Sequence, residues 1–221
     1  MTINDQYKAG KSATYGESVN LNSHMAKNSE WGATVYLAHS KYGANKKKVE
    51  QNKNSSYYTG GTNTVEEIYT TNKTQSTTHN ATGVYDLNGG AWERTAAYVN
   101  NGNENLGTYG GKTAGDIYGA TEKEQSTSTK YKTVYSSENN QSKDYQTAGK
   151  KNKGDAVYET SVTHSNGTGS WFDAYASFPH GAFPFFNRGG GYYGTAAGTF
   201  YFYYGNGGAG SGDSFRPVMA P

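Results

Sequence analysis

The sequence predicts an α+β fold, in which a helix packs on a small, mainly antiparallel sheet and long irregular loops complete a single domain of residues 1–221. Three observations lead to it: a helical pattern begins near Asn28, aromatic residues alternate near the C-terminus, and the segments between are polar and aperiodic. Hydrophobic residues make up 33% of the chain and aromatic residues 14%. Disordered chains carry few aromatic residues, so we expect this chain to fold.

A helix is expected over residues 29–42. Asn28 or Ser29 can cap it, and Glu30 complements the positive end of the helix dipole. Gly43 then ends the helix. Apolar side chains recur at intervals of four, three and four residues, as one helical face requires: Trp31, Val35, Ala38 and Tyr42. This face, together with Trp92 and Trp171, is expected to supply the core.

Turn residues mark the strands in the middle of the chain. Asn88-Gly89-Gly90 predicts a turn and then a strand within residues 84–99, although a helix starting at Ala91 stays open as an alternative. A short strand is expected at residues 65–69, inside a long polar loop of residues 44–82.

Two strands are expected near the C-terminus, at residues 199–203 and 214–219. In the first strand, small and large or polar and apolar side chains alternate. If Phe200 and Phe202 face the core, Tyr201 and Tyr203 face outward.

Residues 121–153 are interpreted as a polar insertion that is mobile or irregular, because they lack the apolar side chains that would offset the entropy of ordering them. Two groups of lysines in the polar segments are expected to be solvated rather than to bind a partner: Lys46, Lys47, Lys48 and Lys53, and Lys143, Lys150, Lys151 and Lys153.

Charge and composition exclude several classes of protein. The formal net charge is +2, which gives no global field to attract nucleic acid, so no nucleic-acid partner is expected. No apolar run approaches the roughly 18 residues of a membrane span, so direct membrane insertion is not expected either. The N-terminal MTINDQYKAG lacks the apolar core of a signal peptide, so export would use another route or a segment outside this chain. The absence of cysteine excludes disulfides, thiolate metal sites and a cysteine nucleophile.

The stretch from Arg188 to Arg216 has the composition of a binding surface. Between its arginines it consists almost wholly of Gly, Tyr, Ala, Ser, Thr, Phe, Asn and Asp. Tyrosine offers a large amphipathic contact area at low entropic cost, while Gly, Ser and Asn supply adaptable hydrogen bonding, as in antibody paratopes. Arginine forms bidentate hydrogen bonds with carboxylates or carbonyls, so Arg188 and Arg216 are expected to clamp the ends of this region.

Five segments together resemble the C-type-lectin-fold variable proteins of diversity-generating retroelements, which are related in fold to the formylglycine-generating sulfatase-modifying domain. The segments are NSEWGATVYLAHSKYG (28–43), NSSYYTGG (54–61), TGVYDLNGGAWE (82–93), FPFFNRGGGYYGTAAGTF (183–200) and SFRPVMAP (214–221). The resemblance implies a C-type-lectin-like fold with a variable C-terminal region, at about residues 188–216, that displays ligand-contacting side chains.

In such systems diversification acts on adenines, so an asparagine codon, AAC or AAT, can become any codon that ends in C or T. Such codons cannot encode Lys, Glu, Gln, Trp or Met, and residues 191–213 contain none of these five. The expected ligand-binding residues are those left facing outward between the framework segments: Gly191, Tyr193, Ala196, Tyr201, Tyr203, Tyr204, Asn206, Gly208, Gly210, Ser211, Gly212 and Asp213.

The function expected from the resemblance is binding of a protein or glycan target, in receptor recognition or adhesion, at a bacterial cell surface or on a phage tail. Two alternatives stay open: a structural surface, pilus or tail subunit without a specific ligand, and a degenerate enzyme of the formylglycine-generating type. The sequence favours no catalytic role, because the family's cysteines are missing and the five histidines are scattered: His24, His39, His79, His164 and His180. No cofactor is expected, a structural calcium at Asp155 with Glu159 or at Asp213 stays open, and the oligomeric state is not indicated.

Overall fold

The computed structural model describes residues 1–12, 22–62, 66 and 68–220. Its helices are α1 (Ile3–Gly10), α2 (Asn28–His39), α3 (Glu104–Gly110) and α4 (Glu122–Ser126), with a π-helical turn at Tyr145–Gly149 and a 3₁₀ turn at Trp171–Asp173. Its strands are β1 (Asn22–Met25), β2 (Trp92–Asn100), β3 (Thr133–Ser136), β4 (Gly167–Thr168), β5 (Tyr175–Ala176), β6 (Phe185–Arg188), β7 (Phe202–Gly205), β8 (Asp213–Phe215) and β9 (Pro217–Ala220).

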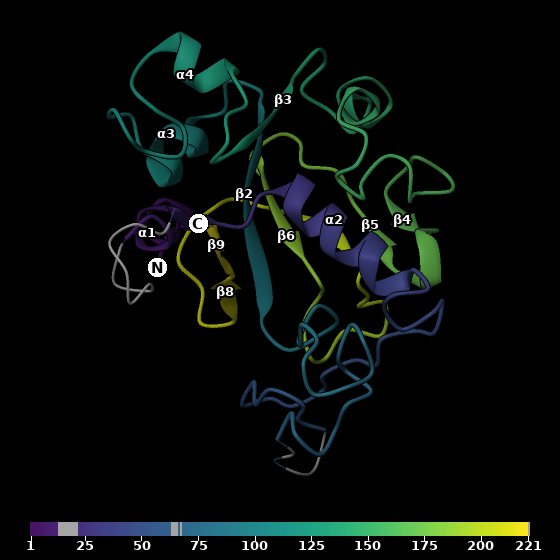
Figure 1. Ribbon diagram of the computed structural model, residues 1–221. Coiled ribbons are helices and arrows are strands. Elements are labelled where there is room, and N and C mark those ends of the chain that lie inside the picture. Colours follow the sequence, from purple (N-terminus) through teal and green to yellow (C-terminus); the bar gives the residue numbers. More distant parts are fainter. Residues whose placement is uncertain (13–21, 63–65, 67, 221) are drawn as a thin grey trace.

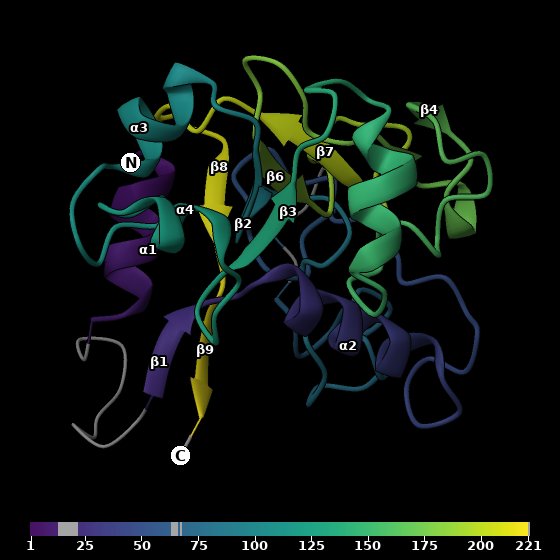
Figure 2. The same cartoon turned by 90° about the horizontal axis from the view of Figure 1, so that it is seen from above.

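A seven-stranded sheet forms the centre of the molecule (Figure 1), with the order β3-β2-β6-β7-β5-β4 and with β8 paired to β2. Its middle pairs, β2 with β6 and β6 with β7, are antiparallel. The pair β4–β5 is antiparallel as well, while β2–β3, β2–β8 and β5–β7 are parallel. Strands β1 and β9 form a separate antiparallel pair (Figure 2). This small sheet with few helices is compatible with the predicted α+β class.

Helix α2 confirms the first predicted element. Trp31, Val35 and Ala38 are buried, and the Trp31 indole N–H donates to the Thr199 carbonyl over 2.9 Å, which ties the helix to the C-terminal region. The helix ends at His39, earlier than expected, and Tyr42 is 74% exposed and outside it. Gly43 lies in the following turn, where a Cβ would come 2.2 Å from the Ala38 carbonyl oxygen, so glycine is required by this close approach.

Alternation along β2 divides the core between the two faces of the sheet. Ala97 and Val99 pack in one apolar cluster, and Ala96 and Tyr98 in another. The second cluster includes Ile3 of α1 and Leu106 of α3; the views in Figures 1 and 2 both place these helices on the side of β2 away from α2. The prediction of a turn followed by a strand is therefore confirmed, and the alternative helix from Ala91 is wrong.

Residues 121–153 contain more regular structure than the prediction of a mobile or irregular insertion implied. They contain α4, β3 and the π-helical turn, and three of their side chains, Tyr135, Tyr145 and Ala148, are completely buried in the cluster that also holds Phe202. Single aromatic residues separated by polar ones are enough to join a core that other segments complete.

Three further predictions need correction. The expected strand 214–219 is two strands separated at Arg216: β8 joins β2, and β9 pairs with β1. Trp171 is 43% exposed rather than in the core. The expected strand at 65–69 falls partly outside the described residues, and Glu66, Ile68 and Tyr69 are not in a strand.

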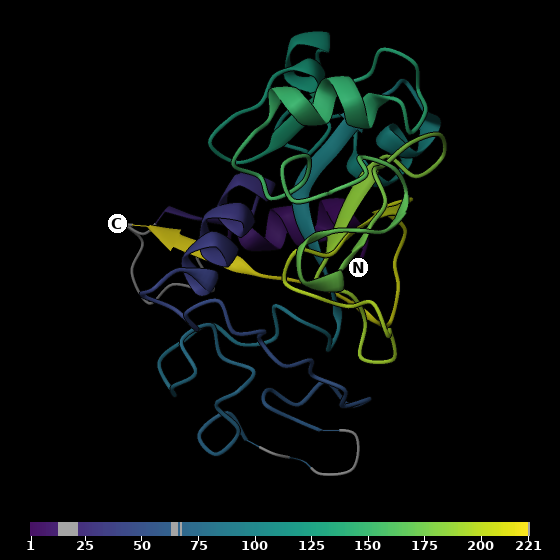
Figure 3. The same ribbon diagram turned by 90° about the vertical axis from the view of Figure 1, so that its right-hand side faces the viewer.

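Helix α1 and strand β1 had no counterpart among the predicted elements. Thr2 and Asp5 form a capping box at the start of α1, which is a local signal for a helix N-terminus. The loop-rich residues 44–62 and 68–91 lie below the sheet in Figures 1 and 3. The two groups of lysines are exposed, as expected. No described helix is long and apolar enough to cross a bilayer.

Candidate functional site

The C-terminal region forms a loop whose two ends lie beside the same residue. Glu93 of β2 is paired on one edge with Arg188, the last residue of β6, and on the other edge with Ser214 of β8. Between these points the chain leaves the sheet, returns as β7 along β6, and leaves it again. We call residues 189–212 the C-terminal loop. The predicted variable region, at about residues 188–216, encloses this loop.

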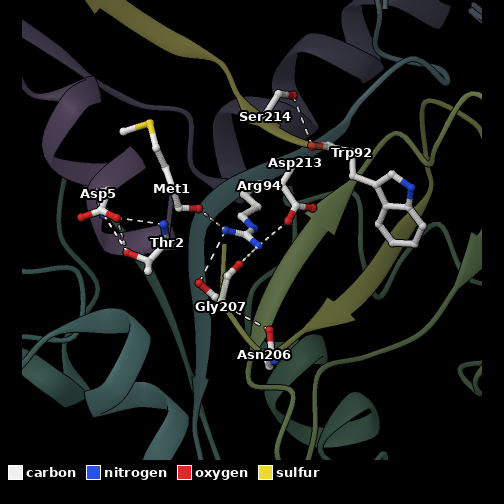
Figure 4. A network of polar contacts seen from close by, with 10 residues as sticks. Met1, Thr2, Asp5, Trp92, Arg94, Asn206, Gly207, Asp213 and Ser214 are labelled. Carbon is white, nitrogen blue, oxygen red and sulfur yellow. Dashed lines mark hydrogen bonds and ion pairs between the residues drawn. The ribbon is translucent and has the colours of Figure 1, made fainter. Parts of the chain in front are cut away.

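Two arginines hold the far end of this loop, where it joins β8. Arg216 Nε donates to Glu93 Oε2 over 3.1 Å, and Arg216 Nη2 donates to Glu93 Oε1 and, over 2.9 Å, to the Tyr85 carbonyl. Arg94 Nη2 contacts Asp213 Oδ2 over 2.5 Å and also donates to the Gly208 carbonyl (Figure 4). Burial raises the pKa of Glu93, and Arg216 opposes the rise. The clamp role of Arg216 agrees with this geometry.

Arg188 does not clamp the near end of the loop in the expected way. Its side chain is fully buried, its guanidinium lies 5.4 Å from the Trp31 ring and 5.6 Å from the Phe202 ring, and Nη2 donates to the Ala156 carbonyl over 3.0 Å. Alternation along β6 sends this side chain into the core under the loop rather than to its edge.

Backbone contacts fix the near end instead. Gln51 Nε2 donates to the carbonyls of Gly191, Tyr192 and Gly194, over 3.1, 3.3 and 2.6 Å. Gly190 has φ +78°, and a Cβ there would lie 2.7 Å from the Ala197 side chain, so the turn requires glycine. Gln51 belongs to the segment interpreted as a long loop, which therefore supports the site.

A cavity of about 750 Å³ touches this loop at Thr195 and Ala197. Two other cavities, which adjoin each other, are lined by the predicted positions of the loop. The larger, which we call the aromatic groove, has a volume of about 680 Å³ and the following lining: Tyr57, Gly90, Trp92, Phe183, Asn187, Tyr192, Tyr193, Tyr203, Tyr204, Gly205, Asn206, Gly210, Ser211, Gly212 and Asp213. The smaller, which we call the side pocket, has a volume of about 330 Å³ and shares three of these residues, Trp92, Tyr193 and Tyr203. Its other lining residues are Tyr175, Gly190, Gly191, Gly194, Thr195, Ala196, Ala197 and Tyr201.

Eleven of the twelve predicted ligand-binding residues line these two cavities. The exception is Gly208, whose carbonyl accepts from Arg94. Exposure differs widely within the set: Tyr193 is 68% exposed, Tyr203 and Tyr204 are half-buried, and Gly191 is buried.

The expectation that Tyr201 faces outward is wrong. Tyr201 is 7% exposed and packs against Trp92, at 5.7 Å between ring centroids, and against Tyr175, at 6.3 Å. The strand begins only at Phe202, so strict alternation does not extend to the residues before it. Phe200 and Phe202 are both buried, as predicted. Tyr201 therefore forms the floor of the side pocket.

The two cavities also use residues that the sequence did not single out as ligand-binding: Tyr57, Trp92, Tyr175, Phe183 and Asn187. Tyr192, one of the tyrosines of the Arg188–Arg216 stretch that were expected to contact a ligand, lines the groove as well. Trp92, expected only in the core, is half-buried at the junction of the two cavities. Asn187 comes from the NRGG segment that precedes the loop. The only signal for these residues lay in the framework segments of the resemblance, which contain all of them except Tyr175.

Ring contacts hold the groove's aromatic side chains in place. The Trp92 and Tyr203 rings are nearly perpendicular, at 82° and 5.4 Å, and Tyr203 stacks on Tyr204 at 4.2 Å. Tyr204 also stacks on His180 at 5.1 Å. A hydrogen bond with Tyr204 and burial raise the pKa of Tyr203 to about 12, so its hydroxyl is neutral at pH 7.

Beyond the tyrosine hydroxyls, the polar side chains of the groove are Asn187, Asn206, Ser211 and Asp213. Asp213 is paired with Arg94. The Asn187 side-chain oxygen and the Trp92 indole nitrogen are buried and have no hydrogen-bond partner among the described residues. The lining thus offers an unpaired acceptor and an unpaired donor within an aromatic wall, which suits noncovalent binding.

Candidate metal ligands are engaged elsewhere. Tyr135 and Tyr36 donate hydrogen bonds to Asp155 and Glu159, over 2.5 and 2.6 Å. Within residues 1–12, 22–62, 66 and 68–220, no group of three or more histidine or acidic side chains is placed to hold a metal ion.

Comparisons of the chain with protein-family models, with curated proteins and with solved structures returned no match.

Proposed function

We propose that this chain is a ligand-binding display protein, and that the aromatic groove and the side pocket recognise a protein or glycan target. The observation that carries the proposal is convergence: eleven residues predicted as ligand-binding from the sequence line two adjoining open cavities. Their volumes, about 680 and 330 Å³, lie in the roughly 300–1,000 Å³ range of ligand pockets.

The way the loop is held supports a display role. Gln51, Arg94 and Trp31 donate hydrogen bonds to backbone carbonyls of the loop, at residues 191–194, 207–208 and 199. Such contacts do not depend on the side chains that the loop carries. A loop fixed through its backbone can change exposed side chains without losing its conformation, and a rigid paratope loses less entropy on binding.

The resemblance gives the proposal its finer form: a C-type-lectin-like scaffold, exposed on a bacterial cell or phage tail, whose loop is diversified by a retroelement. The ends of the loop support this form, since NRGG lies in β6 and the turn after it, and SFRPV lies in β8 and β9. Sequencing around the gene tests it. A nearby reverse transcriptase and a near-copy of the gene's 3′ end, with adenines at the codons of the groove residues, are expected.

Binding itself is tested with arrays of bacterial surface proteins and glycans probed with the labelled protein. The Tyr193→Ala/Tyr203→Ala double variant should lose every specific signal, because both tyrosines line both cavities. Tyr42→Ala is the matched control, since Tyr42 is a 74% exposed tyrosine that lines neither cavity. Signals that survive in the double variant, or an array with no specific signal for the native protein, would contradict the proposal.

A further inference from the structure

We propose that the aromatic groove binds the end of a neutral saccharide, with sugar rings against its tyrosine and tryptophan side chains; this inference rests on the proposed function. The groove is concave, holds about 680 Å³ and is walled mainly by aromatic residues and glycines. A sugar ring has apolar C–H faces edged by hydroxyls. An aromatic wall with a few polar groups complements both features.

The charges around the groove favour a neutral ligand. No lysine, arginine or histidine is found among the described lining residues, and the only ionisable acid there, Asp213, is paired with Arg94. An anionic ligand would lose its hydration without gaining a cationic partner in the groove, which is unfavourable. A cationic ligand would gain little from Tyr204, because His180 and Tyr203 stack against it.

The two unpaired polar groups favour a ligand that carries hydroxyls. Asn187 is 7% exposed and its side-chain oxygen has no partner, and the Trp92 indole N–H has none either. A hydroxyl both donates and accepts, so hydroxyls of one ring can pair with the Asn187 oxygen and with the indole N–H once a small rotation of these side chains brings the buried atoms to the groove surface. An apolar anchor or a quaternary ammonium would leave both groups unpaired, as they are in the protein alone, and would gain no hydrogen bond from them.

Gly191 lies directly against the buried indole nitrogen of Trp92. A Cβ at this position would lie 2.3 Å from Trp92 Nε1, so any other residue would press on the nitrogen from the loop side. Gly191 is itself one of the positions predicted from the sequence to contact ligand. A side chain at this position would have to displace Trp92 or the loop, so glycine is the residue that fits here.

Isothermal titration of the full chain with methyl glycosides tests the inference. The neutral probes are methyl glucoside, galactoside, mannoside and N-acetylglucosaminide, and the acidic ones are methyl glucuronide and the methyl glycoside of N-acetylneuraminic acid. We expect saturable binding of at least one neutral glycoside, at least tenfold tighter than any acidic one. Tighter binding of an acidic glycoside would overturn the inference.

The Asn187→Leu variant tests ligand recognition without destabilising the fold. Leucine has a similar size and removes the unpaired amide, so the unfolding midpoint should stay the same or rise. The affinity for the neutral glycoside should fall at least tenfold, while Tyr42→Ala should leave it unchanged. An unchanged affinity in Asn187→Leu would overturn the inference.

The same experiments distinguish this inference from the proposed function. If no glycoside binds while arrayed proteins bind and lose their signal in the Tyr193→Ala/Tyr203→Ala variant, the saccharide inference is wrong and the display function stands. If neither class binds, both fail.

Discussion

Phe202→Ala should unfold this protein more readily than any change at the neighbouring Tyr203. Phe202 is fully buried, with its ring 5.6 Å from the Tyr145 ring and 6.4 Å from the Phe186 ring. Removing a buried phenylalanine leaves a cavity and costs about 3–5 kcal/mol. The ring also lies 5.6 Å from the Arg188 guanidinium, and losing this contact adds about 1 kcal/mol.

The expected change in the free energy of unfolding is therefore about 4–6 kcal/mol, from the cavity and the cation–π contact together. For a chain of this length, 1 kcal/mol corresponds to roughly 2–4 °C in the melting temperature, so a fall of roughly 8–24 °C is expected. Tyr203→Ala removes a half-buried ring and its stack on Tyr204, which is worth about 1 kcal/mol.

Urea unfolding followed by tryptophan fluorescence, together with melting curves, measures both variants. The slope of the urea transition should be the same for both, since the surface exposed on unfolding changes little. The reasoning would be refuted if Phe202→Ala lost less than about 1 kcal/mol, the range of an ordinary surface substitution. It would also be refuted if Tyr203→Ala lost as much as Phe202→Ala.

Three further predictions follow from the site and the core beneath it. Tyr201→Ala should destabilise the fold by about 3–5 kcal/mol as a buried aromatic, and urea unfolding within 0.5 kcal/mol of the native protein would contradict its burial. Gln51→Ala should speed proteolysis within the C-terminal loop, since three carbonyls lose the side-chain donor that links them to the segment at Gln51, whereas unchanged cleavage would show that Gln51 does not hold the loop. Burial raises the pKa of Asp155 to about 6 from 3.8, so its contribution to stability is complete below pH 4 and is lost as the pH rises through 6. Through this residue the native protein should be about 2–3 kcal/mol less stable at pH 7 than at pH 4. Unfolding curves of Asp155→Asn at the two pH values should no longer show this difference, and an unchanged difference would contradict the prediction.

Helix α2 could be predicted because its apolar face and first-turn acid are local signals, although its N-cap is Lys27 rather than Asn28 or Ser29. Trp31, Val35 and Ala38 repeat at helical spacing, and Glu30 accepts from the Lys27 N–H over 3.0 Å at the first turn. Neither signal needs knowledge of a distant partner.

Residues 121–153 could not be assigned in the same way, because their order depends on distant contacts. Lys132 is an example: lysine is normally exposed, yet this one is buried and its ammonium donates to the carbonyls of Ile117 and Glu124 over 2.7 and 2.6 Å. Tyr135 is likewise held by Asn28, more than one hundred positions earlier. Polar residues that find such partners are satisfied inside a fold, so polarity alone did not indicate mobility.

The sequence predicted the positions of the candidate site that lie in the C-terminal loop, but not those that β2 and β6 contribute. Gly, Tyr and Ser residues concentrated in 191–213 indicated a display surface, and their backbone course brings eleven of the predicted positions to two cavities. Trp92 and Asn187 reach the same cavities from β2 and β6, and only the pairing of these strands places them there. The orientation of Tyr201 was predicted wrongly for a different reason: strand alternation was assumed for a residue that precedes strand β7.

The contacts within the loop divide the predicted positions into two groups with different freedom to vary. The Tyr193 and Ser211 side chains are exposed in the groove, so new side chains there change the ligand surface alone. Asp213 pairs with Arg94, which is 5% exposed, and a buried arginine left without its carboxylate costs roughly 3–5 kcal/mol. Asn206 accepts from the Gly208 N–H over 2.9 Å and shapes the turn. If the loop is diversified, folded variants should therefore retain Asp213 or replace it with another acceptor for Arg94, while Tyr193 and Ser211 change freely.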